Sequence, residues 1–441
     1  MELSPQQATC FDHYLAGDNV FLTGPGGSGK TALIRLMYEH ANRHGRVMQV
    51  CALTGCAAVL LECNAKTIHS WSGVGLCSGH AQEVIENALK RRVTRKAWLE
   101  VQTLIVDETS MMSRKLFGVL DAIGKRARRN QRPFGGIQLI FAGDFFQLPP
   151  VADVIEFCFE SPTWKVAFPY TVQLRRIFRQ NDEVYVNILN HIRKGVLKRS
   201  MNAILMGRVG KTPPSDVTEP TRLFPLRAQA DAINSTKLDA LGGELVETSV
   251  RREYNLPPRT PAEATTIAQA TYSDALVEKE LMHLEARFPG EDTLGLRVGA
   301  QVMCIVNKPL VGLVNGSQGT VESFQGGLPV VDFGGALGAL TMSRHLWRSE
   351  AVPTVGVSQL PLILSWALTI HKSQGVTLER AVIDAGQNIF ECGQTYVALS
   401  RVRSLDGLYL TAFDAAGIKI NSKVQEFYAA LDAAEAAGEK M

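Results

Sequence analysis

Residues 24–31 read Gly-Pro-Gly-Gly-Ser-Gly-Lys-Thr, and this octapeptide decides the fold of the chain. The apolar run 19–23 precedes it, and residues 31–37 follow it with helical spacing. A strand, a glycine-rich loop and a helix in this order form the setting of a phosphate-binding loop. Its glycines let backbone N–H groups converge on phosphate oxygens, and the helix start adds positive potential. The sequence therefore predicts a nucleotide site, and an ordinary glycine-rich turn fits less well because every fixed position of the motif is filled.

The loop itself supplies the first candidate site residues. Lys30 is expected to reach the terminal phosphates, and the hydroxyl of Thr31 to bind Mg²⁺. Backbone contacts to the phosphates are expected from the residues before them, which are Gly26, Gly27, Ser28 and Gly29.

Composition limits the remaining possibilities only loosely. The chain has 441 residues, of which 46% are hydrophobic, and a net charge of +3, so two to four domains are expected. Two basic clusters favour a polyanionic partner over a solvated helix face: Lys90, Arg91, Arg92, Arg95 and Lys96, and then Lys125, Arg126, Arg128, Arg129 and Arg132. The eight scattered cysteines include no CxxC pair, which favours reduced core thiols over a metal site. No signal peptide or membrane-spanning run is recognised, so a cytoplasmic protein is expected.

Three further short apolar runs, 47–52, 103–106 and 137–142, alternate with helical stretches. This pattern predicts an α/β fold with a parallel sheet covered by helices on both faces. Each of these strands ends in small or acidic residues, where the sites of α/β proteins collect.

Asp107 and Glu108 follow the strand at 103–106. We expect Asp107 to bind Mg²⁺ and Glu108 to activate the attacking water as a base. Gln147, in the loop Gly-Asp-Phe-Phe-Gln-Leu-Pro-Pro at 143–150, is a candidate to contact both the γ-phosphate and that water.

A second α/β unit is predicted from a strand at 222–226, a helix through Leu241, and strands at 360–364 and 380–384. Short strands with glycine-rich turns between 297 and 352 predict a small antiparallel barrel inserted into it. A terminal helix is expected at 423–438.

Seven motifs in order resemble the Pif-type helicases, in the RecD-like, 5′-to-3′ branch of helicase superfamily 1. Besides the phosphate loop and the 143–150 loop, they are Asp-Glu-Thr-Ser-Met at 107–111, Pro-Phe-Gly-Gly-Ile-Gln at 133–138, Leu-Arg-Arg-Ile-Phe-Arg-Gln at 174–180, Trp-Ala-Leu-Thr-Ile-His-Lys-Ser-Gln-Gly at 366–375 and Tyr-Val-Ala-Leu-Ser-Arg-Val-Arg at 396–403. The likeness spans about residues 3–413.

The resemblance implies two RecA-like P-loop domains with one insertion in each. The first domain is expected at 1–71 and 101–173, with a small helical wedge at 72–100. The second is expected at 174–242 and 353–441, with an irregular connector at 243–296 and an SH3-like β-barrel at 297–352.

The resemblance also implies residue roles. Gln7 resembles the reader of the adenine, Gly375 approaches the phosphate through its backbone, and Arg179 and Arg401 resemble arginine fingers from the second domain. Contacts to the nucleic-acid strand are implied for Thr54, Gly55, Thr67, His69, Thr369, His371 and Lys372. Trp71 is a minor candidate for base stacking, with a core position as the alternative, and Phe145 is equally ambiguous.

The expected function is ATP- and Mg²⁺-dependent 5′-to-3′ unwinding of tailed or forked duplex DNA from a single-stranded 5′ tail, by a monomer. G-quadruplexes and RNA–DNA hybrids are further possible substrates, and repair, recombination or telomere maintenance are possible pathways. The alternatives are a helicase subunit of a recombination nuclease, a DNA-stimulated ATPase that remodels without unwinding, and an RNA helicase. The fragment Asn307-Lys308 does not predict GTP binding, because Leu310 stands where that motif needs Asp. A bare motor core of bacterial or phage origin is expected.

Overall fold

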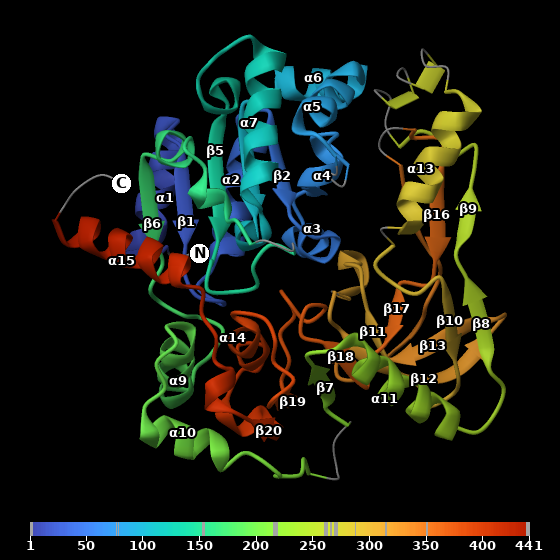
Figure 1. The fold of residues 1–441 in the computed structure, drawn as a ribbon. Helices are drawn as coiled ribbons and strands as arrows, with labels where there is room; N and C mark the ends of the chain where they lie inside the picture. Colours follow the sequence, from blue (N-terminus) through green and yellow to red (C-terminus); the bar gives the residue numbers. More distant parts are fainter. Residues whose placement is uncertain are drawn as a thin grey trace. The chain divides into compact units, whose positions relative to one another are not determined.

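The computed structural model describes residues 3–75, 77, 79–151, 155–214, 219–259, 263–264, 267–268, 272–286, 288–313, 315–349 and 352–437. The chain forms two compact units, one made of residues 1–229 and 368–441 and the other of residues 230–367 (Figure 1). Among the described residues, no helix is both long and apolar enough to cross a membrane.

The first unit begins with a six-stranded parallel sheet of order β3-β2-β4-β5-β1-β6. Its strands are β1 (Val20–Thr23), β2 (Met48–Ala52), β3 (Lys66–Thr67), β4 (Thr103–Asp107), β5 (Gln138–Gly143) and β6 (Tyr170–Gln173). Phe21 packs into one core cluster, whereas Val20 and Leu22 pack into another. Because neighbouring side chains of a strand point to opposite faces, both faces of this sheet are covered.

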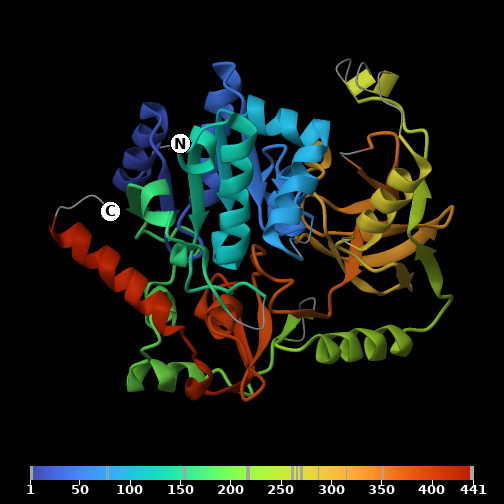
Figure 2. The same ribbon diagram turned by 45° about the horizontal axis from the view of Figure 1, so that its top comes forward.

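The helices associated with this sheet are α1 (Pro5–Ala16), α2 (Lys30–Arg43), α3 (Gly55–Leu61), α4 (Ile68–Trp71), α5 (Ala81–Lys90), α6 (Arg92–Glu100), α7 (Arg114–Arg128) and α8 (Trp164–Ala167). The segment expected as a wedge at 72–100 contains α5 and α6, which lie beside α7 in both views (Figures 1 and 2). Val84, Ile85 and Trp98 are buried in the same core cluster as Phe117 of α7. This segment is therefore continuous with the core of the first sheet.

A second sheet in the same unit has the order β18-β7-β19-β20, in which β19 runs parallel to β7 and β20. Its strands are β7 (Thr221–Phe224), β18 (Ala367–Thr369), β19 (Ala381–Ala385) and β20 (Leu408–Phe413). The helices of this part are α9 (Glu183–Arg193), α10 (Arg199–Met206), α11 (Arg227–Ala240), which continues into the second unit, α14 (Gln394–Leu399) and α15 (Ser422–Ala437). With parallel strands in both sheets and helices between them, the α/β class is confirmed.

The C-terminal helix α15 packs against the first sheet's core rather than continuing the second sheet. Val424, Tyr428 and Leu431 join the cluster that contains Phe21. Gln173 at the end of β6 donates a hydrogen bond to Asp432 of α15 at 3.1 Å. The sequence pattern predicted this helix but not its packing partner.

The second unit is mainly antiparallel, with a five-stranded sheet of order β14-β13-β12-β11-β17. Smaller sheets are β15-β16-β9 and β10-β8. Its elements are β8 (Val246–Ser249), β9 (Arg251–Glu253), α13 (Asp274–Ala286), β10 (Thr293–Leu296), β11 (Gln301–Cys304), β12 (Gln318–Gln325), β13 (Leu328–Asp332), β14 (Ala339–Thr341), β15 (His345–Arg348), β16 (Gly356–Gln359) and β17 (Leu362–Leu364). The strand predicted at 360–364 was assigned to the second parallel sheet, and that assignment is wrong. It is β17, which pairs antiparallel with β11.

The basic cluster at the end of α7 is partly structural. Arg128 donates to the carbonyl of Gly135 at 2.9 Å and to those of Trp98, Leu99 and Val101 at 3.1, 2.9 and 3.1 Å. It thereby satisfies carbonyls at and just beyond the end of α6 that have no helical partner. Lys125 is paired with Asp121 at 2.6 Å. These two cations are engaged within the protein, contrary to the expectation of a polyanion contact for the whole cluster.

We expect Arg128→Ala to lower the free energy of unfolding by about 1–3 kcal/mol, because buried carbonyls lose a charged donor. Arg132→Ala, which removes an exposed cation of the same cluster, should stay within about 0.5 kcal/mol of the wild type. Urea denaturation followed by circular dichroism measures both. Equal stabilities of the two variants would contradict a structural role for Arg128.

Candidate active site

The phosphate loop connects the end of β1 at Thr23 to the start of α2 at Lys30. Gly27 and Gly29 adopt φ values of +81° and +87°. A Cβ on Gly27 would lie 2.4 Å from Cβ of Arg179, and one on Gly29 would lie 2.6 Å from Nε2 of Gln7. Glycine is required at both positions because only its backbone permits this approach.

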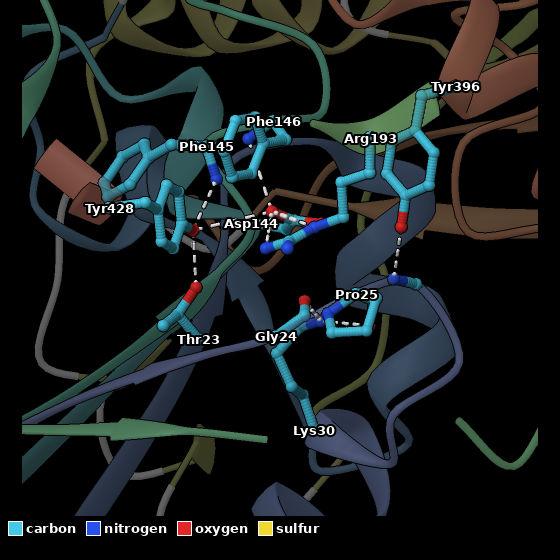
Figure 3. A network of polar contacts seen from close by, with 11 residues as sticks. Thr23, Gly24, Pro25, Lys30, Asp144, Phe145, Phe146, Arg193, Tyr396 and Tyr428 are labelled. Atoms are coloured by element: carbon cyan, nitrogen blue, oxygen red, sulfur yellow. Dashed lines mark hydrogen bonds and ion pairs between the residues drawn. The ribbon is translucent and has the colours of Figure 1, made fainter. Parts of the chain in front are cut away.

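Lys30 is half-buried behind the loop. Its Nζ donates to the carbonyl oxygens of Gly24 at 2.7 Å and Pro25 at 3.1 Å (Figure 3). Burial lowers the pKa of Lys30, while the nearby carboxylates, Asp144 first, act to raise it. The ammonium group thus lies at the loop that the sequence assigned to phosphate.

The two predicted carboxylates lie together at the end of β4. Burial, with a second contribution from Glu108, raises the pKa of Asp107 to about 7, and Lys30 opposes this shift. Glu108 has a left-handed backbone with φ of +56°, a conformation that non-glycine residues adopt mainly at functional or strained sites. Its Oε2 accepts a hydrogen bond from Nε2 of Gln374 at 3.1 Å.

Two guanidinium groups reach the same loop from segments far along the chain. A Cβ built on Gly26 would lie 3.6 Å from both Nη1 of Arg179 and Nη2 of Arg401. Burial, followed by the charge of Arg179, lowers the pKa of Arg401 to about 9. Burial also lowers the pKa of Arg179. An anion at this point would stabilise both charges, because it offsets their desolvation and their mutual repulsion.

A cleft of about 1140 Å³ joins these groups. The sequence-predicted residues that line it are Gly26, Gly27, Ser28, Gly29, Lys30, Thr31, Asp107, Glu108, Gln147, Arg179, Gly375 and Arg401. Thr31 and Asp107 offer a hydroxyl and a carboxylate, the hard oxygen donors that Mg²⁺ prefers, so this donor set fits the metal. Among the described residues, no group of three or more His, Cys, Asp or Glu side chains is placed to hold a metal.

Gln7 lies against the loop rather than lining the cleft. Its Nε2 donates to the carbonyl of Gly29 at 3.5 Å, and its Oε1 accepts from the backbone N–H of Ser4 at 3.0 Å. Phe178 also contacts this region: its ring lies 3.5 Å from the Cβ position of Gly29, and it lines the cleft. The motif at 174–180 contains both residues, so the aromatic residue directly before Arg179 was the available signal for Phe178.

The first group of residues predicted to contact DNA lies at the ends of the strands β2 and β3, which pair in parallel. The side-chain oxygen of Thr54 accepts from the N–H of Ala57 at 3.2 Å, and that of Thr67 from the N–H of Ser70 at 3.3 Å. Each hydroxyl caps a helix start and still has an O–H to donate to a phosphate. Gly55 is exposed at the start of α3, and His69 is half-buried in α4.

The second group of predicted DNA contacts begins at Thr369, the last residue of β18. The hydroxyl oxygen of Thr369 accepts from the N–H of Lys372 at 3.2 Å, and Lys372 is exposed. Burial lowers the pKa of His371, which favours its neutral form. Its ring stacks on that of Phe390, with centroids 6.4 Å apart and planes 21° apart. Phe390 is 52% exposed and was not predicted, because no motif distinguishes it from a core residue.

Trp71 and Phe145 belong to the core. Trp71 is 6% exposed, and its ring lies 4.7 Å from that of Trp98. Phe145 is 2% exposed within an aromatic cluster. Base stacking by Trp71 is therefore not supported.

Two family models match this chain: that of the PIF1-like helicase over residues 2–211, and that of the DNA helicase Pif1 2B domain over residues 281–324. The human ATP-dependent DNA helicase PIF1 is 35% identical over 98% of this chain, and the chain spans 64% of that protein. The Pif1 helicase of Bdellovibrio bacteriovorus is also 35% identical, over 97% of this chain and 92% of the relative. Identity therefore does not separate a bacterial from a eukaryotic source.

Solved structures agree with these relatives. Pif1 helicase from Candida albicans is 33% identical, with a TM-score of 0.76 over 98% of this chain and 99% of that one. A structure described as the basis for unwinding at forked double-stranded DNA by two coordinating Pif1 helicases is 27% identical, with a TM-score of 0.69 over 98% of each chain. With a complete phosphate loop, two arginines at that loop, and matches over nearly its full length, the chain belongs to the Pif1-like family of helicases, which was the expectation from its motifs.

Proposed function

We propose that this chain is an ATP-driven DNA helicase that moves 5′ to 3′ on a single strand and unwinds duplexes from a 5′ tail. The observation that carries the proposal is the convergence of Arg179 and Arg401 on Gly26 of the phosphate loop. Both arginines follow the first parallel sheet in sequence, so the cleft is built from two parts of the chain. Charge on the terminal phosphate would hold those parts together.

The roles of the cleft residues follow from their chemistry. Lys30 binds the terminal phosphates, and Arg179 and Arg401 stabilise charge on the γ-phosphate oxygens as it grows in the transition state. Glu108 orients and deprotonates the attacking water, and Gln147 contacts water and phosphate. Thr31 and Asp107 would hold Mg²⁺, which neutralises phosphate charge when bound. Phe178 is placed to stack on the base beside Gln7. Since one chain supplies both sides of the cleft, we propose a monomer as the hydrolytic unit.

The DNA strand would contact the two groups at the sheet ends. Thr54, Thr67 and Thr369 can donate their hydroxyl hydrogens to phosphates, and Lys372 adds charge without reading sequence. Hydrolysis would remove the charge that bridges the cleft, and the changing grip of the two groups would move the strand.

For the hydrolytic site, we expect Glu108→Gln to bind ATP and to lower the DNA-stimulated kcat about 10²–10⁴-fold, because an amide cannot accept the proton of water. Lys30→Ala should lose nucleotide affinity as well as turnover. Steady-state ATPase and equilibrium nucleotide binding distinguish the two effects. Turnover near that of the wild type in Glu108→Gln would mean that another group activates the water.

For directionality, a duplex with a 5′ single-stranded tail should release its strand with ATP, and the same duplex with a 3′ tail should not. A fluorescence-quenched DNA fork measures release, with Lys30→Ala as the inactive control. Hydrolysis stimulated by DNA without release from either substrate would favour a remodelling ATPase instead. Preference for the 3′ tail would contradict the proposed polarity.

The ring of Phe390 lies beside His371 in the second group of proposed DNA contacts, and we propose that it stacks on a base. We therefore expect Phe390→Ala to weaken single-stranded DNA binding about 5- to 150-fold, the effect of losing one base stack. The ring is exposed, so the fold should persist. Fluorescence anisotropy at one fixed salt concentration measures affinity for a normal oligonucleotide and an abasic one of equal length. The loss should vanish on the abasic strand, whereas an equal loss on both would show that Phe390 does not stack on a base.

A further inference from the structure

A buried ion pair joins the loop after β5 to α9 (Figure 3). Nε of Arg193 donates to Oδ1 and Oδ2 of Asp144 at 3.1 and 2.9 Å, and Nη2 donates to Oδ1 at 2.8 Å. The side chain of Asp144 is fully buried and that of Arg193 is 10% exposed. The guanidinium also faces the rings of Phe146 and Tyr428 at 4.5 and 5.2 Å. Several contacts therefore fix the position of Asp144, which lies three residues before Gln147 in the same loop.

Tyr428 of α15 ties the same junction to the start of the phosphate loop. Its hydroxyl lies 2.6 Å from Oγ1 of Thr23, the residue immediately before the loop. It also accepts from the N–H of Phe145 at 3.2 Å and donates to Oδ1 of Asp144 at 3.4 Å. One oxygen thus links the ends of β1 and β5.

Tyr396 of α14 holds the loop itself. Its hydroxyl accepts the N–H of Gly26 at 3.0 Å, at the point where Arg179 and Arg401 converge. At the start of the same helix, a Cβ on Gly393 would lie 2.5 Å from the carbonyl oxygens of Phe146 and Gln147. Since α14 is a single short helix that leads into Arg401, it spaces the phosphate loop, the Gln147 loop and one arginine relative to each other.

We propose that Tyr396 and Tyr428 are positioning residues for ATP hydrolysis, whose hydroxyls hold Gly26 and Thr23 of the phosphate-loop segment in register with Gln147 and Arg401. The proposal rests on the function proposed above. One hydroxyl contacts Gly26, where Arg179 and Arg401 converge, and the other contacts Thr23, just before the loop. Both therefore act on the geometry of the transition state more than on nucleotide affinity. The C-terminal helices α14 and α15 thereby set the geometry of hydrolysis, in addition to the contribution of Arg401.

The test removes single oxygen atoms. Tyr396→Phe should lower the DNA-stimulated kcat about two- to tenfold, the range for one net hydrogen bond. KM for ATP should stay within about twofold of the wild type, because the lost hydrogen bond acts mainly in the transition state. The equilibrium affinity for ADP should stay within the same range, because ADP lacks the γ-phosphate. Tyr428→Phe should show the same split and carries the test if Tyr396→Phe does not fold.

Tyr185→Phe is the matched control. Tyr185 is fully buried in α9 and donates to the carbonyl of Leu399 at the end of α14, at 2.7 Å. Tyr185 lies at the interface between α9 and α14, and its hydroxyl bonds to α14 rather than to the phosphate-loop segment. Its loss should lower the melting temperature as much as the other substitutions and leave kcat unchanged.

Two results would overturn the proposal: wild-type kcat in the folded Tyr396→Phe and Tyr428→Phe variants, or an equal fall of kcat in Tyr185→Phe. A wild-type protein without DNA-stimulated ATPase would instead overturn the proposed function. The two failures are therefore distinguishable in one set of measurements.

Discussion

Concentrated positive charge at the phosphate loop is the constraint around which the first unit is organised. Arg401 is buried and Lys30 and Arg179 are half-buried close to the loop, and the loss of contact with solvent lowers the pKa of each. Holding like charges in a poorly solvated site costs free energy that surrounding packing must offset. A polyphosphate stabilises such a site, because it supplies the opposite charge where the three cations converge.

The buried carboxylates near this charge have two different environments. Asp144 is paired with Arg193 through three hydrogen-bond contacts, which suits a fixed structural junction. Asp107 has no comparable pairing, and burial beside Glu108 raises its pKa to about 7. Oδ1 of Asp107 accepts the N–H of Glu108 at 2.8 Å, and perturbed carboxylates of this kind are frequent at functional sites. The surroundings of Asp144 fit a structural carboxylate, and those of Asp107 are compatible with the metal-binding role proposed for it.

Local sequence predicted the features that depend on contiguous residues. The strand, loop and helix around Lys30 were confirmed, as were the parallel strands that end at Asp107 and Gly143. The predictions that were wrong concerned partners. The strand at 360–364 exists near its predicted place but pairs with β11, and Arg128 donates hydrogen bonds to backbone carbonyls instead of being available to a polyanion. A strand pattern does not encode its neighbour, and a charged residue in a helix has the same pattern whether its side chain is buried or free.

By itself, the sequence determined the phosphate loop, the acidic pair at 107–108 and the α/β class, because spacing along the chain fixes backbone geometry over a few residues. The tertiary structure alone decided that Tyr396 meets Gly26, that Tyr428 meets Thr23, and that Phe390 stands exposed beside His371. The tyrosine contacts join residues separated by 370 and 405 positions. Such contacts arise from the packing of whole helices, which depends on many side chains at once and leaves no local signature.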